Sequence, residues 1–260
     1  MGLKGKLDEI TKALSAGRSR WAVNAEEKSF DPIKTSLSRL FSKFDPSVRR
    51  HENDDVFTFR PNPTQPPPFP KKYIEIPASV HFVAKVVEGV PYTHRDSPTL
   101  SVLSQILSSL FLHREIREKG GAYGGGLNFS SALSFYSYRD PHFSETLRAF
   151  ADAADFLGNS EDAVTDRDIM EAKLKIFSDL DQPVTPSNRG MGYFKIRVTD
   201  AMKAERRERL FKVDRSDLME VGKKYLNSDL PASYVALGPE KDEGELGEGW
   251  TREKASGNSS

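Results

Sequence analysis

Strand-like segments of this chain come in adjacent pairs, with no helical pattern between the members of a pair. "YIEIP" (73–77) is followed at once by "HFVAKVV" (81–87), and "YGGGLNFSS" (123–131) by "ALSFYSYRD" (132–140). A parallel βαβ sheet would instead show strands alternating with helices. The pairing therefore predicts an α+β fold, a two-layer sandwich in which a mainly antiparallel sheet is covered by helices on one side.

Apolar residues at helical spacing predict the covering layer. A long helix is expected to begin at Asp96 or Ser97, with Pro98 in its first turn, and to end at Gly120 and Gly121. Further segments complete the expected order of elements: helices at 3–14, 32–44, 142–157, 166–180, 187–211 and 214–226, and strands at 19–25 and 233–238.

A proline-rich stretch divides the chain. Residues 45–72 contain "RRHENDD" and "PNPTQPPPFPKK", and proline removes backbone donors and opposes helix. We predict a loop or linker there, between an N-terminal helix-strand-helix part (1–44) and the main domain (73–239). Residues 240–260 are rich in Gly, Glu and Ser, which predicts a disordered tail.

Composition excludes several functions. The 38 basic residues balance the 38 acidic ones, so no overall field attracts nucleic acid or an anionic membrane. The chain has no cysteine, which excludes disulfides, a thiol nucleophile and thiolate metal sites. No stretch approaches the roughly 20 apolar residues that span a bilayer, and no targeting signal is visible at the start. We therefore expect no nucleic-acid or membrane partner.

The stretch "REKGGAYGGG" (117–126) is the most unusual one, and it could be a phosphate cradle, a hinge or a ligand-binding loop. Its glycine spacing fits neither a dinucleotide nor a Walker motif, and a helix C-terminus repels phosphate. Gly120 and Gly121 are expected to cap the helix in the left-handed conformation. The glycines at 124–126 cost roughly 0.5–1 kcal/mol each in a strand, so we expect another backbone or a peptide to approach closely there.

No complete catalytic machinery is visible. The five histidines form neither His-Glu-x-x-His nor His-x-x-Glu-His, and no Gly-x-Ser-x-Gly occurs. "HRE" (113–115) is best explained as a solvated helical face, and "HENDD" (51–55) as loop. We therefore predict that this chain binds no metal.

Longer segments resemble the presequence protease family, zinc metallopeptidases of the pitrilysin group found in mitochondria and plastids. These segments are "FLHREIREKGGAYGGG" (111–126), "FYSYRDP" (135–141), "EAKLKIFSDLDQPVTPSNRG" (171–190) and "LGPE" (237–240). The similarity extends from about residue 3 to about residue 250. It implies a pitrilysin-like fold of four homologous domains in two halves around a closed chamber, of which this chain resembles the last.

The resemblance also implies a site. Arg117 and Tyr123 match residues that reach the substrate near the zinc and stabilise its oxyanion, and Gly124, Gly125 and Gly126 would let the strand lie against peptide backbone. The zinc ligands lie in the first domain of the family, so zinc belongs to the complete enzyme and this chain is expected to be inactive alone.

The implied partners are unstructured peptides, such as cleaved presequences, and the N-terminal catalytic half; the implied location is the mitochondrion. Two alternatives stay open. The chain could be a non-catalytic pitrilysin-like scaffold subunit, or a truncated product without function.

Overall fold

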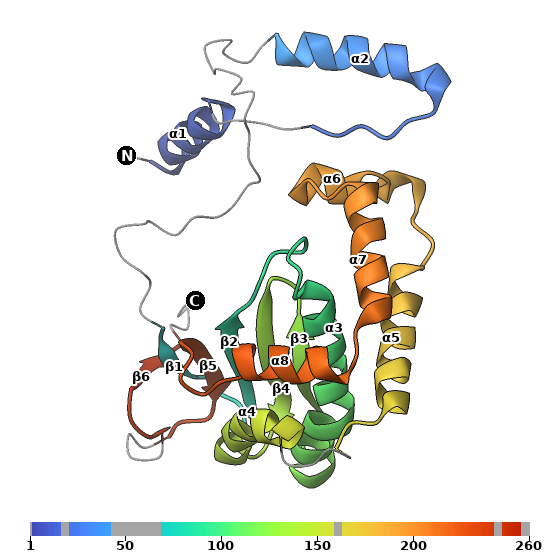
Figure 1. Cartoon of the computed structure of the whole chain (residues 1–260). Coiled ribbons are helices and arrows are strands. Elements are labelled where there is room, and N and C mark those ends of the chain that lie inside the picture. Colours follow the sequence, from blue (N-terminus) through green and yellow to red (C-terminus); the bar gives the residue numbers. More distant parts are fainter. Residues whose placement is uncertain (1, 17–20, 43–68, 159–162, 242–245, 256–260) are drawn as a thin grey trace. The chain divides into compact units, whose positions relative to one another are not determined.

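The computed structural model describes residues 2–16, 21–42, 69–158, 163–241 and 246–255, which fall into two units (Figure 1). The smaller unit joins Met1–Arg60 to Pro183–Thr199, and the larger joins Pro61–Gln182 to Asp200–Ser260. A segment late in the sequence thus belongs to the same unit as the N-terminal helices. The division expected at residues 44 and 72 did not include residues 183–199 with the N-terminal part.

The described part of the larger unit contains one mixed sheet of six strands, in the order β3-β4-β2-β5-β1-β6. β3, β4, β2 and β5 pair antiparallel, whereas β1 pairs parallel with both β5 and β6. The strands are β1 (Lys71–Glu75), β2 (His81–Glu88), β3 (Gly124–Phe129), β4 (Ala132–Asp140), β5 (Ala232–Gly238) and β6 (Trp250–Lys254). The predicted α+β fold is confirmed.

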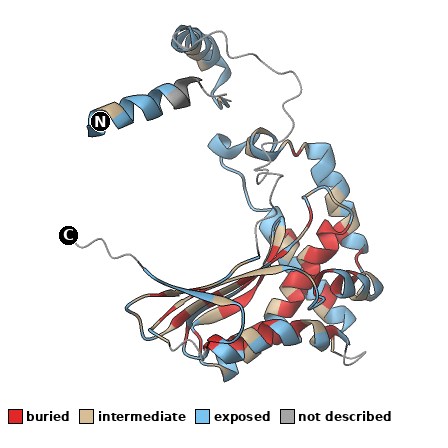
Figure 2. Ribbon diagram, turned by 90° about the vertical axis from the view of Figure 1, so that its left-hand side faces the viewer, coloured by how far each residue is buried: buried red, intermediate tan, exposed pale blue. Residues whose placement is uncertain are grey.

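Helices cover one face of this sheet. α3 (Ser97–Ile106) continues directly into the π-helix η1 (Leu107–Lys119), and α4 (Phe143–Gly158) and α8 (Arg215–Tyr225) pack beside them (Figure 1). The other helices in the described part of the unit are α5 (Asp166–Leu180) and α7 (Asp200–Lys212). Figure 2 shows in red the buried residues of the sheet and of the helices that cover it.

The core between the two layers is aromatic and aliphatic. The rings of Phe135 on β4 and Phe150 on α4 lie 5.4 Å apart, and Leu103 and Leu107 are fully buried. Burying one such side chain contributes about 1.5–3 kcal/mol. The sheet face that packs against the helices is therefore buried in the core. A ligand must bind the opposite face of the sheet, its edges or the helices.

Two expectations about segment ends were wrong. Residues 250–254, expected in a disordered tail, form β6, and Lys71 and Lys72, expected in the linker, begin β1. The indole of Trp250 packs edge-on against Phe143 at 5.3 Å, and Leu246 is buried. The polar composition suggested that the loss of chain entropy would keep this segment disordered. The apolar contacts and the β1–β6 ladder offset that loss.

The helix expected over 187–211 is interrupted. A 3-10 turn (Pro186–Asn188), α6 (Met191–Ile196) and α7 replace it. Gly190 and Arg197 flank α6 with φ of 75° and 57°, in the left-handed region that a continuous α-helix excludes.

The smaller unit contains α1 (Leu3–Ala16) and α2 (Glu27–Phe41), and α2 buries none of its residues. The helix expected at 32–44 thus begins five residues earlier and contains Pro32. Residues 21–25, expected in a strand, are not part of one, and residues 19 and 20 lie outside the described ranges. Within this unit the Asn24 amide donates to the carbonyls of Ser187 and Arg189, at 2.8 and 3.0 Å.

Candidate functional site

The turn after η1 positions the candidate residues. Gly121 has a φ of 73°, as expected of a left-handed cap, and its N–H donates to the Arg117 carbonyl at 2.9 Å. Gly120, in contrast, is right-handed (φ −83°), so the expectation of two left-handed glycines was wrong for it. A Cβ at Gly120 would lie 2.6 Å from the Ile116 carbonyl oxygen, so close packing against the helix end explains this glycine.

Tyr123 lies directly after this turn. Its N–H donates to the Tyr138 carbonyl at 3.1 Å, and its ring meets the Tyr138 ring edge-on at 5.8 Å. The side chain is nevertheless 72% exposed. The backbone of Tyr123 is thus fixed by β4 while its phenol remains accessible to a ligand.

Arg117 is exposed near the end of η1. Its Nη1 lies 3.1 Å from Nε2 of His113, one turn earlier on the same helix. Because a guanidinium can only donate, Nε2 of His113 must accept, which places the imidazole proton on Nδ1. Nδ1 in turn lies 3.8 Å from a carboxylate oxygen of Glu118.

His113 therefore orients the guanidinium of Arg117. The interpretation of "HRE" as a solvated face did not include this contact of His113. The i, i+4 spacing of His113 and Arg117 was the available signal. The structure gives Arg117 and Tyr123 separate neighbours, His113 and Tyr138 respectively.

The three strand glycines differ in their surroundings. A Cβ at Gly125 would lie 2.6 Å from Cγ2 of Ile116, and one at Gly126 would lie 3.1 Å from Oγ of Ser108. Both positions are thus crowded by η1 of the same chain. A Cβ at Gly124 would meet nothing within 4 Å. Of the three, Gly124 has the open space that an approaching peptide needs.

The outer edge of β3 is partly occupied. Oγ of Ser108 accepts from the Leu127 N–H at 2.8 Å and donates to the Leu127 carbonyl at 2.9 Å. An added strand would need these two backbone groups. Peptide contact at Gly124 therefore fits the open face of the sheet better than strand addition along the whole edge.

The sheet face opposite the core helices carries an apolar row that starts at Tyr123. The Tyr138 ring meets Phe82 at 5.3 Å, Phe82 is registered with Leu237, and Leu237 with Ile74. This open-face row consists of Tyr123, Tyr138, Phe82, Leu237 and Ile74. All five are at least partly exposed, which suits contact with apolar side chains of a ligand.

A metal centre would need several ligating side chains close together. In the described ranges, no three His, Cys, Asp or Glu side chains gather where they could hold an ion. The ligand set that zinc requires is thus not found among them. In the same ranges, no helix has both the length and the apolar character needed to cross a bilayer.

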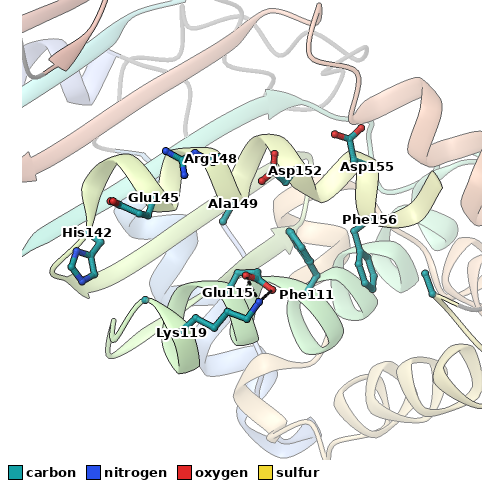
Figure 3. Close-up of a pocket in the computed structure, with 12 residues that line it drawn as sticks. Phe111, Glu115, Lys119, His142, Glu145, Arg148, Ala149, Asp152, Asp155 and Phe156 are labelled. Atoms are coloured by element: carbon teal, nitrogen blue, oxygen red, sulfur yellow. Dashed lines mark hydrogen bonds and ion pairs between the residues drawn. The ribbon is translucent and has the colours of Figure 1, made fainter. Parts of the chain in front are cut away.

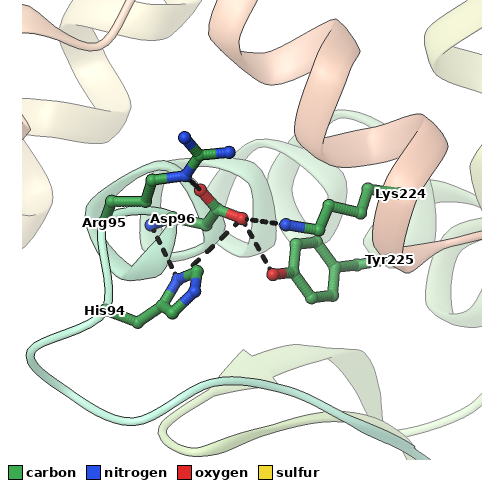
Figure 4. A network of polar contacts seen from close by, with 5 residues as sticks. All are labelled: His94, Arg95, Asp96, Lys224 and Tyr225. Carbon is green, nitrogen blue, oxygen red and sulfur yellow. Dashed lines mark hydrogen bonds and ion pairs between the residues drawn. The ribbon is translucent and has the colours of Figure 1, made fainter.

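A second polar cluster lies at the start of α3 (Figure 4). The carboxylate of Asp96 accepts from Lys224 Nζ at 2.6 Å and from the Tyr225 hydroxyl at 2.8 Å, both on α8. Burial alone would raise the pKa of Asp96, but hydrogen bonds from Lys224 and Tyr225 outweigh it and hold this pKa below its usual value. Because its members bond to one another and tie α3 to α8, this cluster stabilises the fold.

We expect Asp96→Ala to lower the free energy of unfolding by about 2 kcal/mol, because it removes charge-assisted hydrogen bonds. Since the folded-state pKa of Asp96 is lowered, this stabilisation is complete above the unfolded-state pKa of about 3.9 and is lost as the pH falls through the folded-state value. Denaturant titrations at several pH values measure it, with exposed Asp229→Ala as the control. An equal loss at pH 7 and in strong acid would contradict the assignment.

Comparisons with known proteins agree with this fold. An inactive domain of an M16 peptidase from Pseudomonas fluorescens superposes with a TM-score of 0.54 at 20% identity, covering 66% of this chain and 44% of that one. A protease from Helicobacter pylori gives 0.56 at 16% identity, with 79% and 52% covered. The inactive peptidase domain of a candidate zinc protease from Bordetella parapertussis gives 0.53 at 13%, with 65% and 95% covered. The fold is that of M16 peptidase domains.

Comparisons of the sequence identify the family more specifically than the fold does. The model of the family described as "PreP C-terminal domain" matches residues 71–230, so the chain belongs to that family, as its resemblance to presequence proteases predicted. The mitochondrial presequence protease of Danio rerio is 45% identical over 175 residues, that of Saccharomyces cerevisiae 45% over 170, and that of Mus musculus 37% over 223. These alignments cover 66%, 64% and 84% of this chain but only 17%, 17% and 21% of the relatives. The chain thus corresponds to about a fifth of their length.

Proposed function

We propose that this chain is the C-terminal substrate-binding domain of a mitochondrial, presequence-degrading zinc endopeptidase. The observation that carries the proposal is the placement of Tyr123, exposed at the start of the open-face row and one tight turn from Arg117. Membership of the presequence protease family supports the substrate class, and the names of the relatives support the mitochondrial location.

The chemistry assigned to the two side chains is hydrogen-bond donation. A phenol and a guanidinium both donate to a peptide carbonyl oxygen, and more strongly as that oxygen gains negative charge in the transition state. His113 keeps the Arg117 guanidinium oriented, and the Tyr138 carbonyl fixes the backbone at Tyr123. Hydrogen-bond donors that are already oriented before the reaction stabilise the transition state effectively, because they need no reorganisation when the charge develops.

Peptide binding is assigned to the open face. Gly124 leaves room for a peptide backbone beside Tyr123, and the open-face row offers apolar contact to its side chains. An unstructured peptide exposes both its backbone and its apolar side chains, whereas a folded protein hides most of them. The proposed partners are therefore unstructured peptides, such as cleaved presequences.

Zinc is assigned to the complete enzyme and not to this chain, because the described residues offer no suitable ligand set. The N-terminal catalytic half is accordingly the second proposed partner. When bound there, zinc would supply Lewis-acid chemistry. This chain contributes Arg117 and Tyr123.

A non-catalytic scaffold is the alternative. It is favoured by the descriptions of two solved proteins with this fold as inactive peptidase domains, although they share only the fold. The two functions differ in whether this chain supports turnover when a zinc-binding half is present.

A chimaera tests the proposal. The matching segment of the Danio rerio presequence protease is replaced by this chain, and hydrolysis of a fluorogenic unstructured peptide is measured with and without a chelator. We expect chelator-sensitive hydrolysis by the chimaera and none by this chain alone. A folded chimaera that retains zinc but does not hydrolyse the peptide would support the scaffold.

A further inference from the structure

A groove of about 850 Å³ runs between η1 and α4, in the helical layer of the larger unit (Figure 3). The rings of Phe111 from η1 and Phe156 from α4 stack at 5.0 Å at one end, and Ala149 lines the wall between the ends. The groove is therefore partly apolar.

The α4 side of this groove is acidic. Glu145, Asp152 and Asp155 line it, are exposed, and have no hydrogen bond or ion pair with any residue in the described ranges. On the η1 side, by contrast, Glu115 is already paired with Lys119 at 2.9 Å. Among the described residues, Arg148, the one cation of α4, also has no such partner, so the described part of the groove keeps an excess of unmatched negative charge.

The spacing of these residues suits a helical occupant. Glu145, Ala149, Asp152 and Phe156 recur at i, i+4, i+7 and i+11, so they form one stripe along α4. α4 has 16 residues and is thus about 24 Å long, and η1 runs beside it. Two helices with an apolar seam can accept a third helix that lays its own apolar face between them.

We propose that this groove is an exosite for a cationic amphipathic helix, with the apolar face of the helix on Phe111, Ala149 and Phe156 and its arginines beside Glu145, Asp152 and Asp155. The choice of peptide rests on the proposed function, since mitochondrial targeting peptides are amphipathic, rich in arginine and poor in acidic residues. The groove itself does not depend on that function.

The position of the groove relative to Tyr123 indicates how the exosite would act. Gly120 and His142 line it, and Gly120 is three residues before Tyr123. A peptide whose helical segment rests in the groove can continue around this turn to the open face of the sheet, and its binding in the groove raises the effective concentration of its remaining residues at Tyr123. The exosite thus selects targeting peptides over other unstructured peptides.

The test measures binding to the whole 260-residue chain by fluorescence anisotropy, so it requires no catalysis. The probe is a labelled synthetic amphipathic peptide with arginines on one helical face and leucines on the other. We expect Glu145→Gln/Asp152→Asn/Asp155→Asn to weaken its affinity about tenfold or more, because three ion pairs are lost. The control Glu208→Gln/Asp229→Asn/Glu248→Gln removes the same charge from exposed positions outside the groove and is expected to bind as the wild type does.

Peptide variants keep the test independent of folding effects. Replacing arginine by glutamine, or leucine by serine, is expected to weaken binding to the wild-type chain, and salt should weaken the binding of the cationic peptide. Equal loss in the groove and control variants would mean that only net charge matters and would overturn the exosite, as would wild-type affinity in the groove variant. Since hydrolysis is not the readout, failure of the catalytic assignment would leave this result standing.

Discussion

Tyr123→Phe and Arg117→Ala are each expected to lower the turnover of the chimaera roughly ten- to a thousandfold, with zinc content unchanged. Tyr123→Phe removes only the hydroxyl and keeps the ring that contacts Tyr138. If that hydroxyl donates to the developing oxyanion, kcat falls more than KM rises, because the interaction is made chiefly in the transition state. Steady-state kinetics and metal analysis measure both quantities.

The controls for this experiment are residues that the candidate site does not include. Tyr193 is 52% exposed and Arg167 is exposed on α5, so Tyr193→Phe and Arg167→Ala make the same chemical changes elsewhere. Both are expected to retain wild-type turnover. Wild-type turnover in the Tyr123 and Arg117 variants as well would refute the assignment of these residues.

The second large effect is expected from a pair of adjacent glycines. Gly125→Ala should lower the free energy of unfolding by about 1–3 kcal/mol, because its Cβ would overlap the buried side chain of Ile116 and force β3 away from η1. Gly124→Ala has open space and should be neutral or slightly stabilising. Denaturant titrations of the two variants provide the comparison.

The same pair separates packing from peptide binding. If a peptide backbone lies against Gly124, Gly124→Ala raises KM in the chimaera while stability is retained. Equal destabilisation by the two substitutions would show that the packing of β3 against η1 is described incorrectly. Unchanged kinetics with Gly124→Ala would remove this residue from the binding site.

Local patterns in the sequence were sufficient for much of the fold. The strand expected at 132–140 and the helix expected at 166–180 match β4 and α5 to the residue. The reason is that alternating polar and apolar residues in a strand, and amphipathic spacing in a helix, are visible within the segment itself. β6 was missed because its partner β1 lies far away in the sequence, and a short polar strand gains its stability from that partner. The π-helical form of η1 likewise has no signal in the apolar pattern that we used.

The same limit applies to the candidate site. Arg117 and Tyr123 could be named from the sequence, and their roles are still predictions. The crowding of Gly125 by Ile116 could not be foreseen, because it depends on how closely β3 packs on η1. The groove residues were not predicted either, because the apolar spacing within each segment does not show that α4 lies beside η1.

The parallel pairing of β1 with β6 has a consequence for how the chain folds. Lys71 is registered with Trp250, so the ladder that completes this side of the sheet joins opposite ends of the larger unit. Contacts so distant along the chain form late, because loop closure must come first. During synthesis β1 cannot acquire this neighbour until β6 has left the ribosome, so the nascent chain carries an unprotected strand edge while the intervening residues are made.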